Sequence, residues 1–212
     1  MQIKNYNIMR NIILISSLFI VSISMNAQAI IPVEQIYQYV QENKGNVPKH
    51  KYYKDVNNVL NKYVGEWEGT YTNKTFYFKI SKQIKKVSRV SNTTHYDELK
   101  VQYKITNQQT GKVIQDKFKA SSKQLNRGMS KFLTKNTYPM DYYADTKKQI
   151  GCGDRGLMII KSESKNKLKI HVVPRAVVRA LIEGEPDPCD GVSVDLPFPR
   201  SEDKAMILTK KK

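Results

Sequence analysis

Few residues of this 212-residue chain have the types and the spacing that chemistry requires. The histidines His50, His95 and His171 lie far apart in the sequence, and none has the short spacing to another ligand that metal sites show. Asp187 and Asp190 flank a turn, but two carboxylates provide fewer oxygens than a calcium cage needs. We therefore predict no metal site, no cofactor and no catalytic residue, and a non-enzymatic protein is favoured.

One hydrolase-like arrangement stays open. Asp141, Asp145 and Asp154 are candidates to pair with Glu66 or Glu68, because a hydrolase of this type uses two carboxylates at a defined separation. The sequence does not show that separation. An enzyme is therefore the less favoured alternative.

Residues 1–29 have the features of a cleavable secretory signal. A positively charged start precedes a short apolar run, Ile12–Ile23, and the small residues Ala27 and Ala29 stand before a cut at Ile30. The run is too short to serve comfortably as a permanent membrane-spanning helix. We therefore expect an exported protein, periplasmic or secreted, whose mature chain of 183 residues has no membrane span.

Cys152 and Cys189 are the only cysteines. Export places them in an oxidising compartment, and they lack a CxxC spacing, so we predict one disulfide that closes a span of 37 residues. The loop-entropy model puts its contribution at about 4 kcal/mol. The glycine-rich segment 151–156 lacks the Lys-Ser/Thr ending of a phosphate-binding loop, so we expect it to give flexibility around the disulfide. A catalytic cysteine is the alternative, but no histidine is placed convincingly beside either thiol.

The chain is strongly basic. Its net charge of +17 falls by two to +15 after cleavage, because the signal carries two basic residues and no acidic one. Such a charge favours anionic surfaces, but most of the lysines are scattered as they are on solvent faces of strands. The few arginines argue against specific phosphate or base recognition, so we expect no nucleic-acid partner. The densest basic groups are Lys79, Lys82, Lys85, Lys86 and the ending Lys210-Lys211-Lys212.

Two kinds of periodicity divide the chain. Before Gly65, apolar residues recur at helical spacing in Val33–Val40 and in Tyr52–Tyr63, which predicts two short helices. From Gly65 onward the period is two, which predicts strands connected by hairpins without a βαβ rhythm. The predicted strands are Gly65–Tyr71 with Phe76–Ile80, Leu99–Thr106 with Lys112–Phe118, Leu157–Ser162 with Leu168–Val173, a closing Met206–Thr209, and an additional candidate, Gly128–Thr134. This pattern favours an antiparallel barrel or sandwich, and a barrel has the advantage of removing exposed sheet edges.

Gly65-Glu66-Trp67, at the start of the first strand, resembles the Gly-x-Trp signature of lipocalins. The run Tyr63–Tyr71, with Phe76–Ile80 and the ending Met206–Lys210, is similar to an uncharacterised group of small exported proteins of Bacteroidota that have one lipocalin-like β domain of unknown function. The resemblance is close over residues 60–82 and looser over 99–118 and 157–173.

The resemblance implies a mostly β protein with a single antiparallel up-and-down barrel of about eight strands. The expected organisation is a signal peptide over 1–29, a short helical lead-in over 30–63 and a lipocalin-like β-barrel domain over 64–212. Gly65 and Trp67 would close one end of the barrel. Lys210 is our candidate for the basic residue that packs over this tryptophan in lipocalins.

We expect an exported, non-enzymatic, monomeric protein that binds a small apolar or amphipathic ligand in its interior. Alternate strand residues would line that interior. The expected lining is Tyr71, Phe76, Phe78, Val101, Tyr103 and Ile170. The alternative is a surface-interaction protein that holds anionic glycans or envelope components through its charge and exposed tyrosines. Tyr138, Tyr142 and Tyr143 are candidates to line a barrel mouth or to stack on sugars.

Overall fold

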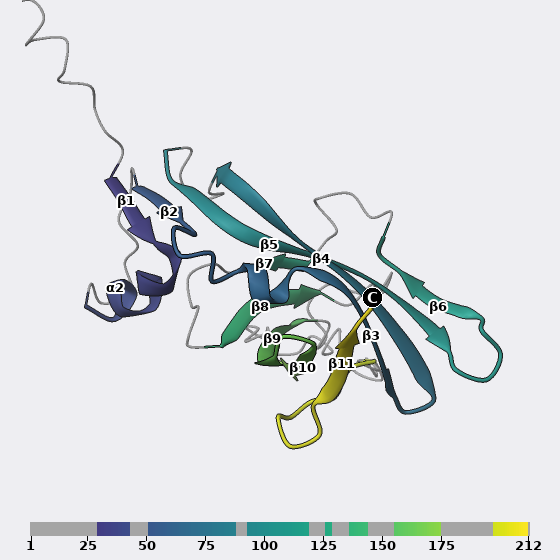
Figure 1. Cartoon of the computed structure of the whole chain (residues 1–212). Helices are drawn as coiled ribbons and strands as arrows, with labels where there is room; N and C mark the ends of the chain where they lie inside the picture. The colour runs from purple at the N-terminus through teal and green to yellow at the C-terminus, as the bar shows by residue number, and fades with distance from the viewer. Residues whose placement is uncertain are drawn as a thin grey trace, which may run out of the picture.

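The structure is a computed structural model that describes residues 29–42, 51–87, 93–118, 126–128, 136–143, 155–174 and 197–211. Within these residues, eleven strands form one sheet, accompanied by one short α-helix (Figure 1). The prediction of a mostly β protein is therefore confirmed. No helix in the described part of the chain is long and apolar enough to cross a membrane. Most of the predicted signal, and both cysteines of the predicted disulfide, lie outside the described residues.

The first hairpin forms as predicted. Strand β3 (Gly65–Tyr71) pairs antiparallel with β4 (Lys74–Val87), and the connecting residues Thr72 and Asn73 both have positive φ, as tight hairpin turns require. Trp67 pairs with Phe78 in this register, so the alternating apolar residues of both strands share one face. The strand β4 is longer than predicted and continues to Val87.

The strands of the second and third predicted hairpins and the closing strand are also present. The second hairpin is formed by β5 and β6, the third by β9 and β10, and β11 is the closing strand. Of the candidate strand Gly128–Thr134, Gly128 ends β7 and residues 129–135 lie outside the described ones. Strand β8 was not predicted. The bounds are β5 (His95–Asn107), β6 (Val113–Asp116), β7 (Asn126–Gly128), β8 (Thr137–Tyr143), β9 (Arg155–Ser164), β10 (Lys167–Pro174) and β11 (Met206–Lys210).

The segment before β3 is only partly helical. It begins with β1 (Ala29–Pro32), followed by the 3-10 turn η1 (Val33–Gln35) and the predicted helix, α2 (Ile36–Glu42). The second predicted helix is wrong. Its start is the strand β2 (Lys51–Lys54), and only a 3-10 turn, η2 (Asn61–Tyr63), follows.

Long-range contacts explain why β2 is extended. It pairs in parallel with β1 on one side and with β5 on the other. Tyr53 stacks on Tyr96 of β5, with ring centroids 5.0 Å apart. These partners come from distant parts of the sequence, and they outweigh a helical spacing of apolar residues that is only local. Figure 1 shows β1, α2 and β2 together at one end of the sheet.

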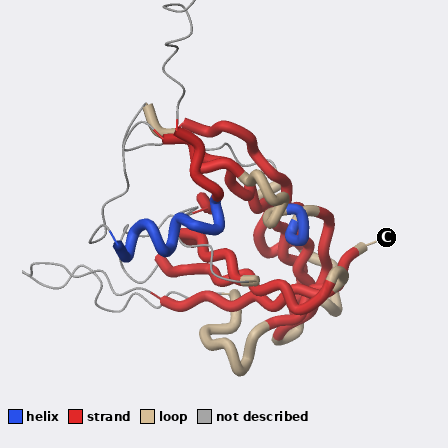
Figure 2. Tube along the Cα trace, turned by 60° about the vertical axis from the view of Figure 1, so that its left-hand side comes forward, coloured by secondary structure: helices blue, strands red, loops and turns tan. Residues whose placement is uncertain are grey.

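The sheet order is β1-β2-β5-β4-β3-β11-β10-β9-β8-β7, and β6 pairs with β5 off this path. Strand β7 also pairs with β5, so the pairings lead back to β5 and the strands curve around a shared interior (Figure 2). The three-residue β7 contributes only two residue pairs on each side of this junction. The sheet is mixed, and it is not closed into the up-and-down lipocalin-like barrel that we predicted.

The second edge of β5 explains this difference. A closed barrel would need one long strand along that edge, but three short strands share it. Strand β2 pairs with His95 and Tyr96, β7 pairs with Lys100 and Val101, and β6 pairs from Lys104 to Thr106. The parallel pairing of β2 thus occupies an edge that an up-and-down barrel would use for its own closure.

Candidate functional site

The predicted lining residues do gather in one place. Five of the six are buried in a hydrophobic cluster inside the curved sheet: Phe76, Phe78, Val101, Tyr103 and Ile170. Tyr71, at the end of β3, is partly buried and packs against this cluster. The alternation of each strand therefore identified the inward face correctly, because the pleat directs every second side chain to the same side.

Phe198 occupies the centre of this aromatic interior. It belongs to the irregular segment before β11, yet only 2% of its surface is exposed. Its ring centroid lies 5.3 Å from that of Phe76, 5.5 Å from that of Tyr103 and 5.3 Å from that of Tyr142. These separations are typical of packed aromatic pairs. The side chain thus fills the interior at this level of the sheet.

A pocket of about 320 Å³ lies against Phe198 and Tyr71. We call it the Phe198 pocket. Three of its residues, Lys74, Arg200 and Lys204, carry a positive charge, whereas none carries a negative one. The complete lining is Tyr71, Thr72, Lys74, Pro197, Phe198, Arg200, Ser201 and Lys204. The pocket therefore joins aromatic surface to a group of cations.

Gly65 and Trp67 lie toward the other end of β3. Trp67 is fully buried and donates a hydrogen bond from Nε1 to the backbone oxygen of Tyr63, at 2.9 Å. The Lys210 ammonium lies 5.2 Å from the centroid of the Trp67 ring. Lys210, our candidate for a basic residue over this tryptophan, does lie beside its ring. The Tyr63 ring is also fully buried, and burial raises the pKa of its hydroxyl well above the usual range.

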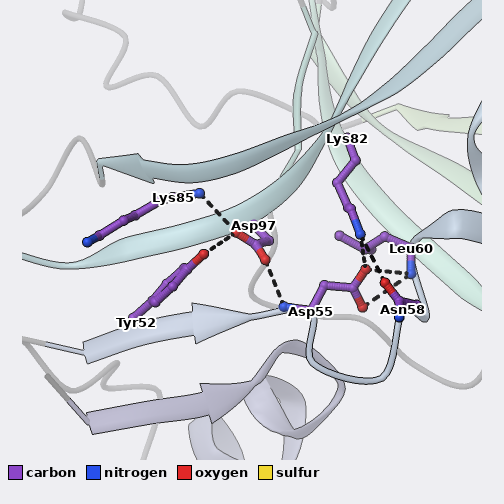
Figure 3. A network of polar contacts seen from close by, with 7 residues as sticks. All are labelled: Tyr52, Asp55, Asn58, Leu60, Lys82, Lys85 and Asp97. Atoms are coloured by element: carbon purple, nitrogen blue, oxygen red, sulfur yellow. Dashed lines mark hydrogen bonds and ion pairs between the residues drawn. The ribbon is translucent and has the colours of Figure 1, made fainter. Parts of the chain in front are cut away.

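Two buried carboxylates form the most connected polar group in the described residues (Figure 3). Asp97 of β5 accepts hydrogen bonds from the Tyr52 hydroxyl at 2.7 Å, from the Asp55 backbone N–H at 2.9 Å and from the Lys85 backbone N–H at 2.9 Å. Asp55 in turn accepts from the backbone N–H of Leu60 and from the ammonium of Lys82, at 3.1 Å. Burial, reinforced by the hydrogen bond to Asp97, raises the pKa of Tyr52 to about 12.

This pair of carboxylates joins two parts of the fold. Tyr52 and Asp55 come from β2 and the turn that follows it, whereas Asp97 and Lys85 belong to the long hairpin of β5 and β4. Both carboxylates are occupied by donors from the protein itself. The arrangement therefore fastens β2 to the main sheet, because a buried carboxylate is stable only when such donors satisfy it.

The two histidines among the described residues lie on different strands, β5 and β10. His95 lies edge-on to Tyr52, whereas His171 is on β10, where burial lowers its pKa although the nearby Glu202 and Asp203 oppose this change. His50 lies outside the described residues. In the part of the chain that the structure describes, no three histidine, cysteine or acidic side chains are grouped as metal ligands.

The candidate carboxylates for a hydrolase are not joined either. Glu66 and Glu68 lie on β3, where they form ion pairs with Lys79 and Lys211. Asp141 lies on β8, which β11, β10 and β9 separate from β3 in the sheet. Asp145 and Asp154 fall outside the described residues.

Some residues of the pocket had no local signal in the sequence. Phe198, Arg200 and Lys204 belong to a segment without periodicity, so nothing marked Phe198 as buried or the two cations as neighbours of Tyr71. Tyr138 and Tyr142 also differ from expectation. They were candidates for an exposed mouth, but both point inward from β8 and are fully buried. The side chain of Tyr143 lies outside the described set.

Residues 9–174 match the model of a family described as "Family of unknown function (DUF6705)". No curated protein and no solved structure is detectably similar to the chain.

Proposed function

We propose that this chain, which belongs to the DUF6705 family of unknown function, is an exported, lipocalin-like, non-enzymatic protein that binds a small amphipathic anion in the Phe198 pocket. The observation that carries the proposal is the composition of this pocket. Its aromatic wall, formed by Tyr71 and Phe198, continues into the buried interior, and its rim has three cations. An anion with a short apolar tail matches both halves.

The chemistry of the two halves differs. Tyr71 and Phe198 offer apolar surface, on which each buried methylene contributes about 0.8 kcal/mol. Lys74, Arg200 and Lys204 favour a carboxylate, sulfate or phosphate head, and the planar guanidinium of Arg200 is suited to two hydrogen bonds with such a group. Phe198 sets the depth of the pocket, because its ring already occupies the interior behind it.

The volume favours a small ligand. Pockets for small molecules commonly range from about 300 to 1,000 Å³, and the Phe198 pocket, at about 320 Å³, stands at the lower limit. A medium-length fatty acid is therefore a better model ligand than a sterol or a long-chain lipid. The lipocalin-like part of the proposal is supported by the Gly-x-Trp start of β3 and by the placement of Lys210 over Trp67.

The test is calorimetric titration of the exported chain with octanoate and with octanol, at low and at physiological salt. The two probes share a tail and differ in charge. We expect octanoate to bind more tightly than octanol, and we expect only octanoate to lose affinity as salt rises, because salt screens the exposed cations. Equal affinity for the two probes, or no binding of octanoate, would overturn the proposal.

A matched pair of variants places the binding site. Arg200→Gln combined with Lys204→Gln should weaken octanoate binding about tenfold, which corresponds to about 1.4 kcal/mol, and should leave octanol binding unchanged. Lys112→Gln combined with Lys165→Gln removes the same charge from two exposed turns and serves as the control. If both double variants weaken octanoate equally, the effect comes from net charge and the assignment of the pocket is wrong.

A further inference from the structure

A second concave site lies on the outer face of the sheet. The side chains that alternate with the core residues of β3, β4 and β5 point away from the interior. In register, Glu66 is opposite Lys79 and Lys79 is opposite Gln102, while Tyr77 lies between Glu68 and Lys104. Except for Glu68, these side chains line a groove of about 640 Å³, twice the volume of the Phe198 pocket.

Phe118 forms a wall of this groove. The chain continues from β6 back along β5, where the Lys117 backbone N–H donates to Tyr103 O at 2.8 Å. The Gln102 side-chain amide then donates to the backbone oxygen of Phe118 at 2.6 Å. These two hydrogen bonds hold Phe118 beside the outer surface of β5. We call this site the outer groove; its lining is Glu66, Trp67, Tyr77, Phe78, Lys79, Gln102, Lys104, Phe118 and Lys211.

Two lysines meet at one aromatic ring within the outer groove. The ammonium of Lys104 lies 5.2 Å from the centroid of Tyr77, and that of Lys211 lies 5.4 Å from it. Cation–π attraction at these distances holds both charges near the ring. Lys104 lies on β5, which pairs with β4, whereas Lys211 directly follows β11, which pairs with β3 on the other side of β4. Their meeting at Tyr77 is therefore a product of the sheet topology.

Acidic residues neutralise this positive charge only in part. Lys211 forms an ion pair with Glu68 at 3.2 Å, and Lys79 forms a long one with Glu66 at 3.9 Å, in which both side chains are mostly exposed. Such exposed pairs contribute little. Among the described residues, no carboxylate forms an ion pair with Lys104. The groove therefore presents a net positive charge to a ligand.

We propose that the outer groove binds an acidic sugar, a hexuronate unit of an anionic polysaccharide, with its carboxylate between Lys104 and Lys211. This site is separate from the Phe198 pocket and does not depend on the function proposed for it. The two lysines supply the counter-charge. The Gln102 amide and the Tyr77 hydroxyl are neutral groups that suit sugar hydroxyls, and Phe118 offers an apolar side to the pyranose ring.

The mixture of groups favours a sugar over an acidic peptide. An acidic peptide would gain from a continuous row of cations, but here each lysine stands beside an aromatic or neutral polar side chain. A uronate has one carboxylate, several hydroxyls and an apolar ring face within a single unit. That combination matches the composition of the groove more closely than carboxylates on flexible stems.

The test is calorimetric titration of the exported chain with three probes of similar length. They are an oligomer of galacturonic acid, a neutral oligomer of glucose and a poly-glutamate peptide. We expect measurable binding of the uronate oligomer at low salt, weaker binding at physiological salt and at least about tenfold weaker binding of both other probes. Equal binding of the glucose oligomer or of the peptide would overturn the proposal, and so would no binding of the uronate.

Variants locate the binding. Lys104→Gln and Lys211→Gln should each weaken uronate binding, and together they should weaken it about tenfold or more. Lys112→Gln with Lys165→Gln is the matched control, since it removes two charges outside the groove lining. If Lys104→Gln and Lys211→Gln match this control, the assignment is wrong. Octanoate binding reports on the Phe198 pocket separately. It should be the same in the Lys104→Gln, Lys211→Gln double variant as in the control double variant. If this groove variant loses octanoate binding but keeps uronate binding, the result counts against the Phe198 pocket as the octanoate site and against the outer groove as the uronate site.

Discussion

The ammonium of Lys210, at the end of the last strand, lies 5.2 Å from the centre of the Trp67 ring in the first strand of the hairpin series. The two residues are far apart in the sequence, and the antiparallel pairing of β11 with β3 places them directly opposite each other. The strength of this contact therefore measures how well β11 is joined to β3.

We predict a coupling free energy of about 1 kcal/mol between these residues, the usual size of a cation–π pair. A double-mutant cycle of Trp67→Phe and Lys210→Met, followed by urea denaturation, measures it. Lys211→Met replaces Lys210→Met in the control cycle, because the neighbouring ammonium lies over Tyr77 instead. An equal coupling free energy in both cycles would show that the contact of Lys210 with Trp67 adds no specific stabilisation.

Gly65 should tolerate no side chain. Its φ is +143°, and a Cβ built there would meet Lys210 Cε at 2.6 Å. We expect Gly65→Ala to cost about 1–3 kcal/mol of unfolding free energy, and we expect a smaller cost when Lys210 is already alanine. Gly111→Ala is the comparison, since Gly111 also has positive φ but nothing lies near its added methyl. Equal costs in the presence and absence of Lys210 would contradict the crowding argument.

Asp97→Asn should release the N-terminal segment from the sheet. The variant removes the charge that three donors share, and we expect a loss of about 2–3 kcal/mol. Hydrogen exchange should accelerate first in β1 and β2, because these strands depend on the anchor more than the core strands do. Glu42→Gln, at an exposed position, is the control. Uniform acceleration over the whole sheet would argue against a local fastening role.

Phe198→Ala should destabilise the protein and deepen its pocket at the same time. Removal of this buried ring costs about 3–5 kcal/mol. The space that it leaves should admit more of an apolar tail, so the variant should bind dodecanoate more tightly than the unaltered chain does. If the alanine variant does not fold, Phe198→Leu provides a smaller cavity and a smaller effect in the same direction. An unchanged dependence on chain length would contradict the role of Phe198 as the floor of the pocket.

Stability should fall as the pH drops below about 6.5, the usual pKa of histidine. Burial lowers the pKa of His171 in the folded protein; Lys161 acts in the same direction, and Glu202 and Asp203 oppose it. Between the folded and the unfolded pKa, the unfolded chain binds more protons, so unfolding free energy rises with pH in this window. His171→Gln should flatten the slope in urea titrations between pH 5 and pH 7. An unaltered slope in His171→Gln would assign the effect to another group.

The period-two pattern of the chain determined most of the sheet and its inward face. Phe76, Phe78, Val101 and Tyr103 could be identified from sequence, because strand alternation is a local property that survives in any sheet arrangement. The Gly-x-Trp resemblance singled out Gly65 and Trp67, whereas Lys210 was a candidate that no local pattern of the sequence supported. The turn of the first hairpin also depends on adjacent residues only, because its geometry is set by the positive φ of Thr72 and Asn73.

Contacts between distant segments decided the rest. Tyr52 and Tyr53 have helical spacing, but pairing with β1 and β5 makes their segment a strand. Three short strands, β2, β6 and β7, share the edge of β5 that a closed barrel would need. Because these strands are far apart in the sequence, no local pattern indicates that they compete for the same edge. Phe198 has no periodic neighbours, and only the folded chain brings its ring among Phe76, Tyr103 and Tyr142. The physical reason is that burial of an irregular segment, and the choice among competing edge partners, depend on the free energy of the whole packed arrangement, whereas alternation and turn chemistry are set by adjacent residues.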